Sequence, residues 1–84
     1  MNTNEISITM APVESSQIAA IGHDANNSIL AIQFKRGDGL GSTYHYQNFD
    51  AEKFAELQAA PSIGSHFYKN IKPFAEQFPY AKID

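Results

Sequence analysis

The 84-residue chain contains no cysteine, so disulfide bonds are excluded and a zinc site would lack its most characteristic ligand. Tryptophan is also absent, and no stretch approaches the roughly 18–20 apolar residues that span a bilayer. The first ten residues show neither a basic start nor a continuous apolar run, as a signal peptide would. These absences predict a cytoplasmic protein with no membrane segment and no cofactor.

Basic residues are scarce: six Lys and Arg stand against nine Asp and Glu, for a net charge of −3. A dedicated double-helix binder usually has a basic excess, because phosphate neutralisation supplies most of its affinity. Binding of nucleic acid would therefore need a local basic patch. The hydrophobic content of 43% predicts a folded domain. A domain this short, without disulfides, gains stability from self-association, so a homo-oligomer is one expectation.

Three stretches predict the strands of an antiparallel meander: 18–24, 28–36 and 42–49. In the second stretch Leu30, Ile32 and Phe34 share one face. Residues 1–12 form an N-terminal arm whose alternating pattern allows a further edge strand, and 13–84 form one domain. The segment 37–41, GDGLG, is not a phosphate loop, because neither Lys-Ser/Thr nor a helix follows it. We expect a long, flexible hairpin connection there.

Two helices are predicted after the strands. Asp50 is placed as an N-cap, and Phe49 and Phe54 have the spacing of a hydrophobic staple. That helix ends near residue 60, because Pro61 follows. The second helix is expected over 62–74, with an apolar stripe. The stripe consists of Ile63, Phe67, Ile71 and Phe74. We therefore predict an α+β fold with both helices on one face of the sheet; Phe78 and Tyr80 then lie over the core or in an edge strand.

Tyr44 and Tyr46 raise a choice between a core pair and a stacking platform for flat ligands. Both project to one face of their predicted strand. The face with Leu30, Ile32 and Phe34 is the one apolar enough to lie beneath helices, so we predict that the tyrosines join that core.

The start of the second predicted helix is the candidate binding site. Helix N-termini bind anions through free N–H groups and the macrodipole, and a glycine there permits close approach. An ordinary solvated helix face remains the alternative. The candidate ligand-binding residues are Ser62, Gly64, Ser65, His66, Lys69 and Lys72, joined by Arg36 from the hairpin.

No catalytic or metal-binding group stands out. His23, His45 and His66 lie on different predicted elements, and the serines are explained by turns and caps. Glu52 and Glu56 share one helix face and indicate a solvated acidic surface. The sequence therefore predicts a protein that is not an enzyme.

Short motifs in a fixed order resemble the KTSC domain, a family named for its occurrence at the C-terminus of some lysyl-tRNA synthetases. The motifs are Ser15-Ser16-x-Ile18, Ile21-Gly22-His23-Asp24, Leu30-x-Ile32-x-Phe34, Tyr44-His45-Tyr46 and Ala60-x-Ser62-x-Gly64-Ser65-His66-Phe67, followed by Asn70, Ile71 and Tyr80. The resemblance spans about residues 13–80. His23 stands where the family usually has tyrosine, Ile63 where a basic or polar residue is common, and the 36–41 loop looks longer.

The resemblance implies a small binding domain, found also alone in bacterial and phage proteins, for which RNA binding has been suggested by association. The leading hypothesis is a non-catalytic domain that contacts RNA or nucleotide phosphates. One alternative is a protein–protein interaction module, such as a phage-type inhibitor or an accessory subunit. Another is an oligomeric sponge for a small anionic nucleotide.

Overall fold

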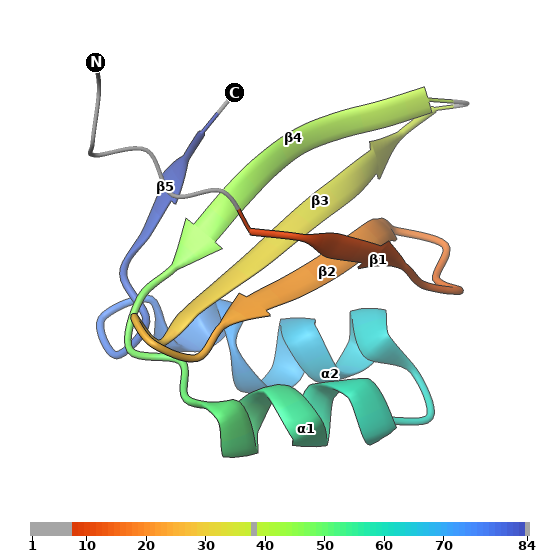
Figure 1. The fold of residues 1–84 in the computed structure, drawn as a ribbon. Coiled ribbons are helices and arrows are strands. Elements are labelled where there is room, and N and C mark those ends of the chain that lie inside the picture. Colours follow the sequence, from red (N-terminus) through yellow and green to blue (C-terminus); the bar gives the residue numbers. More distant parts are fainter. Residues whose placement is uncertain (1–7, 38, 84) are drawn as a thin grey trace.

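The computed structural model describes residues 8–37 and 39–83. Five strands form one antiparallel sheet in sequence order, and two helices cover one of its faces (Figure 1). The strands are β1 (Met10–Pro12), β2 (Ile18–Asp24), β3 (Ile29–Arg36), β4 (Gly39–Tyr46) and β5 (Tyr80–Lys82). The helices are α1 (Ala51–Ala59) and α2 (Ile63–Asn70), followed by the 3₁₀ turn η1 (Lys72–Phe74). The predicted α+β fold is confirmed, with the meander extended by an edge strand on each side.

The N-terminal edge strand confirms the expectation for the arm, whose residues 1–7 lie outside the described part of the chain. β1 pairs with β2 in the register Met10↔Gly22, and Pro12 is its last residue. Gly22 makes this pairing possible: a Cβ there would collide with the carbonyl oxygen of Thr9 and touch Ile8. A glycine in β2 therefore lets the arm pack against the sheet.

The expected long loop at 37–41 is wrong. β4 already begins at Gly39, which pairs with Arg36 across the hairpin. Among the glycines described, only Gly37 has a positive φ, of 57°, so Gly39 and Gly41 have the negative φ of ordinary strand residues and extend the ladder. The β3–β4 hairpin is consequently long and its turn short, and its strands curve away from the helices (Figure 1).

Both predicted helix caps are present. The Asp50 carboxylate accepts a hydrogen bond from the Lys53 N–H at 2.9 Å, and the Ser62 hydroxyl accepts one from the Ser65 N–H at 3.2 Å. The predicted end of the second helix at residue 74 is wrong, because α2 ends at Asn70. Pro73 has no N–H and disfavours helical backbone at the preceding residue, so the chain continues as a 3₁₀ turn.

The core lies between the sheet and the helices. It confirms the predicted positions of Leu30, Ile32 and Phe67, whereas Phe74, expected in the stripe, is 48% exposed. Its fully or nearly buried members are Ile18, Ile21, Leu30, Ile32, Tyr46, Phe49, Leu57, Phe67, Ile71 and Phe78. Phe78 thus fills the core while Tyr80 begins β5, so each of the two expected roles of the tail is taken by one residue. Within the described residues, no helix is long and apolar enough to cross a membrane.

Candidate functional site

A cleft of about 430 Å³ lies between the sheet and the α2–η1 segment. Its residues come from β3, β4 and β5, from helix α2, from the 3₁₀ turn η1 and from the residue that follows η1. They are Phe34, Lys35, Arg36, Gly41, Ser42, Tyr44, Tyr46, Phe67, Tyr68, Lys72, Ala75 and Tyr80. We call this site the aromatic–basic cleft.

All four tyrosines of the chain line the aromatic–basic cleft. Tyr46 is only 6% exposed and meets Phe67 edge to face at 5.5 Å, so its predicted place in the core is confirmed. Tyr44 is half-buried and contacts Tyr80, with ring centroids 5.8 Å apart. Tyr68 and Tyr80 are 38% and 54% exposed. The choice between core and platform therefore has two answers: the inner tyrosine is core, and the outer rings present aromatic surface to the cleft.

A β-bulge shapes the cleft beside Phe34. The register between β3 and β4 shifts there, because Gly41 and Ser42 together lie opposite Phe34. A Cβ on Gly41 would come within 3.1 Å of the Phe34 carbonyl oxygen and 3.4 Å of the Arg36 Cβ. Glycine therefore leaves this part of the cleft wall without a side chain. Bulges of this kind re-aim strands next to functional sites.

Positive charge gathers at the cleft although the chain is acidic overall. Lys35, Arg36 and Lys72 line it, and no Asp or Glu of the described residues does. Alternation along β3 places Arg36 on the face of Phe34 and Lys35 on the other face, so Arg36 and Lys72 are the cations that face a ligand. The Lys72 ammonium lies over the Tyr68 ring, 4.9 Å from its centroid.

Tyr46 stays neutral at the bottom of this cleft. Burial raises its pKa to about 12, and repulsion by the phenolates of Tyr80, Tyr44 and Tyr68 adds to the effect. The tyrosine is therefore a phenol, with a proton to donate, throughout the physiological range.

Comparison with known proteins places this geometry in a family. The sequence model of the KTSC domain matches residues 14–75, which is most of the chain. The chain belongs to the KTSC domain family. A protein of Tsukamurella paurometabola is 42% identical over 64 residues, which cover 76% of this chain and 90% of that protein. The crystal structure of a KTSC domain protein from Yersinia pestis superposes with a TM-score of 0.78 at 35% identity, over 93% of this chain and all of that one.

The candidate residues from the sequence do not form one site in this KTSC domain. Arg36 and Lys72 both line the aromatic–basic cleft. Lys69 is exposed on α2 and is not among the residues of that cleft. His66 lies beside a separate small hollow, where Asn70 donates to its carbonyl oxygen at 3.2 Å. The predicted set is thus divided among the aromatic–basic cleft, the small hollow, the exposed surface of α2 and the start of that helix.

The start of α2 is largely occupied by contacts within the domain. The Ser62 hydroxyl caps the helix. Gly64 is buried, and a Cβ on it would come within 3.1 Å of the Ser15 hydroxyl oxygen. Its lack of a side chain serves the packing of α2 on the segment before β2. Ser65 is exposed beside it.

Sequence reasoning missed Tyr68 and Tyr80 as parts of the site. Tyr68 stands between the apolar stripe and the polar face of α2, and Tyr80 lies in a tail whose position was open. Only the register Tyr46↔Tyr80 brings the tail tyrosine to the same face of the sheet. The available signal was the number of tyrosines: all four belong to elements that meet at one edge of the sheet.

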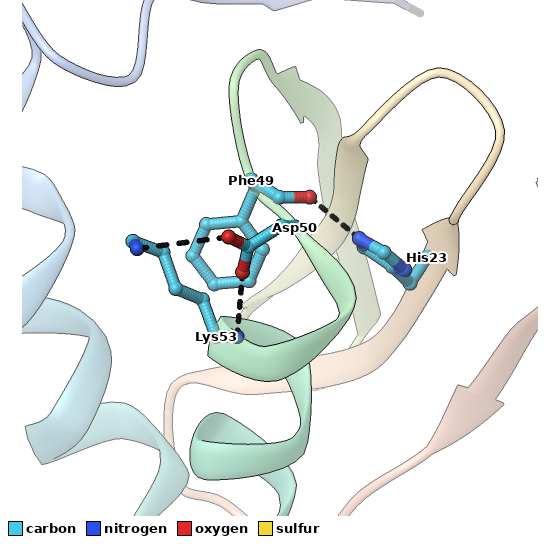
Figure 2. A network of polar contacts seen from close by, with 4 residues as sticks. All are labelled: His23, Phe49, Asp50 and Lys53. Atoms are coloured by element: carbon cyan, nitrogen blue, oxygen red, sulfur yellow. Dashed lines mark hydrogen bonds and ion pairs between the residues drawn. The ribbon is translucent and has the colours of Figure 1, made fainter.

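His23 lines a second groove, of about 400 Å³, between β1–β2 and α1. Its Nε2 lies 2.6 Å from the carbonyl oxygen of Phe49, directly before the Asp50 cap (Figure 2). Because a carbonyl only accepts, Nε2 is the nitrogen that carries the proton. Lys53 forms a long ion pair with Asp50, at 3.9 Å. Among the residues described, no three His, Asp or Glu lie close enough together to hold a metal ion.

Proposed function

We propose that this KTSC domain is a non-catalytic binding module that takes a nucleobase and its phosphate in the aromatic–basic cleft. One observation carries the proposal: four tyrosines and two inward-facing cations share a cleft in which no described carboxylate takes part. Aromatic faces accept any base, and stacking contributes about 1–3 kcal/mol per base. Guanidinium and ammonium groups supply charge-assisted hydrogen bonds to phosphate.

The charge pattern supports a local site rather than a general polyanion surface. The net charge of −3 opposes a polyanion at long range, so attraction depends on the cleft itself. A free nucleotide and a single-stranded RNA end present the same chemistry to such a site. Comparing the affinities for the polymer and for the monomer distinguishes these two sources.

Calorimetric titration at low salt tests the proposal, with nucleoside monophosphates and a short single-stranded RNA as probes. We expect Arg36→Ala and Lys72→Ala together to weaken binding by about 100-fold, since each lost charge-assisted contact costs roughly 1.5 kcal/mol. Lys69→Ala is the matched control, because this exposed lysine on α2 lies outside the cleft. If Lys69→Ala weakens binding as much as the double variant, the helix face is the site and the cleft is not.

A protein-interaction module is the second candidate, because a large apolar side chain is exposed on the projecting hairpin. Leu40 is 67% exposed near the start of β4. A bound protein would bury it. A partner captured from nuclease-treated lysate supports this candidate if Leu40→Ser abolishes its capture and the Arg36→Ala, Lys72→Ala double variant does not.

A further inference from the structure

We infer that the ligand of the aromatic–basic cleft is a single free nucleotide, with one or two phosphates and no bound metal ion. This inference rests on the proposed function and narrows it to one class of small molecule. It follows from the size of the cleft, the count of its charged groups and the contact between Lys72 and Tyr68.

The cleft has the dimensions of a small-molecule site. Its volume of about 430 Å³ lies near the lower end of the range for ligand pockets, roughly 300–1,000 Å³. One base with its sugar fits such a volume, whereas a polymer needs a track that continues beyond it. Lys82 pairs with Tyr44 across β4 and β5, so it lies beside the cleft on the same face of the sheet.

The charged groups match one or two phosphates without metal. Arg36 and Lys72 face the ligand and Lys82 lies beside it, so a charge of about −2 or −3 is balanced; a phosphate monoester carries about −1.5 to −2 at neutral pH. Mg²⁺ that accompanies a triphosphate is usually held by one or two protein carboxylates. No described carboxylate lines the cleft, so the cleft offers no protein ligand to the Mg²⁺ of a magnesium–triphosphate complex.

When such a ligand binds, Lys72 and Tyr68 exchange partners: Lys72 leaves Tyr68 for the phosphate, and Tyr68 contacts the base. In the free protein the ammonium covers the Tyr68 ring at 4.9 Å. At an exposed site this cation–π contact is weaker than a charge-assisted hydrogen bond to phosphate. A bound phosphate therefore draws Lys72 away, and the freed face of Tyr68 stacks on the base. A nucleoside also has to displace the ammonium from Tyr68, but it has no phosphate that could form a new contact with Lys72.

The test measures the affinities of adenosine, AMP, ADP and ATP, with Mg²⁺ and with EDTA, and of an adenosine tetraribonucleotide. Guanosine, cytidine and uridine are measured alongside, each as the nucleoside and as the monophosphate. We expect at least one monophosphate to bind about tenfold or more tightly than its nucleoside, as one phosphate contact requires. Mg²⁺ should not improve ATP binding, and the tetranucleotide should bind no more tightly than the best mononucleotide.

Two variants test whether Lys72 leaves Tyr68 when a phosphate binds. Lys72→Met should remove most of the preference for AMP over adenosine while leaving adenosine affinity unchanged or improved, because the Tyr68 face is uncovered. Tyr68→Trp creates the one tryptophan of the chain, and its fluorescence should be quenched by the monophosphates that bind. If Lys72→Met weakens adenosine and AMP equally, the exchange does not occur.

The outcomes separate this inference from the proposed function. Tighter binding of ATP only with Mg²⁺, or binding of the tetranucleotide more than tenfold tighter than any mononucleotide, overturns the free-nucleotide inference and leaves a nucleic-acid or nucleotide site. Absence of binding to every nucleotide and to RNA overturns both.

Discussion

The imidazole of His23 lies nearly parallel to the ring of Phe54, with 4.9 Å between the centroids and 14° between the planes. The same imidazole donates to the Phe49 carbonyl oxygen (Figure 2). Phe49 and Phe54 are the two positions at which a hydrophobic staple would join, and His23 reaches both. One side chain of β2 therefore fixes the start of α1 on the sheet.

Replacing His23 should destabilise the domain in two separable ways, through loss of the hydrogen bond to the Phe49 carbonyl oxygen and through loss of the ring stacked on Phe54. His23→Phe keeps an aromatic ring on Phe54 but leaves the Phe49 carbonyl without this donor, so we expect the free energy of unfolding to fall by about 1–2 kcal/mol. His23→Ala also leaves a cavity and should cost about 2–4 kcal/mol. Urea unfolding measures both. Equal losses for the two variants would show that the stacked ring contributes nothing.

Gly22 should tolerate no side chain, whereas Gly39 should. At Gly22 an added Cβ meets the Thr9 backbone, so Gly22→Ala is expected to lower the free energy of unfolding by about 1–3 kcal/mol. At Gly39 the nearest atom would be the Arg36 carbonyl oxygen at 3.9 Å, and Gly39→Ala should be neutral or stabilise by up to about 1 kcal/mol. Amide hydrogen exchange in β1 provides the second readout, since only Gly22→Ala should expose it. Unchanged exchange and stability in Gly22→Ala would contradict the close approach of the arm.

Tyr46 should make the domain sensitive to alkali. Its pKa is raised to about 12 in the folded state from 10.0, so the unfolded chain loses this proton first. The associated stability is fully present below pH 10 and is lost as the pH rises towards 12. We expect this to lower the free energy of unfolding by roughly 1–2 kcal/mol across that window. Denaturant unfolding of the wild type and Tyr46→Phe at pH 9 and 11 measures it. The prediction fails if Tyr46→Phe loses as much stability between the two pH values as the wild type.

Local patterns were sufficient for much of the fold. The alternation of Leu30, Ile32 and Phe34, and the caps Asp50 and Ser62, depend on neighbours a few residues away, so periodicity and capping chemistry predict them. Two segments differ from the fold predicted by these patterns, and in both the cause is a local residue. Glycines at 39 and 41 suggested a loop but continue a strand, and Pro73 ends the apolar stripe before Phe74.

The sequence by itself determined the family of this protein, the starts of both helices and most of the strands, because these follow from residue spacing. The candidate site was decided by tertiary structure. The pairing of Tyr46 with Tyr80 and the placement of Arg36 and Lys72 in one cleft join segments distant in sequence, and the bulge opposite Phe34 is a shift of register within the β3–β4 hairpin. Such contacts depend on strand register, and a shift by one residue would turn Tyr80 to the opposite face. No local pattern sets that register, so the cleft becomes visible only in the folded chain.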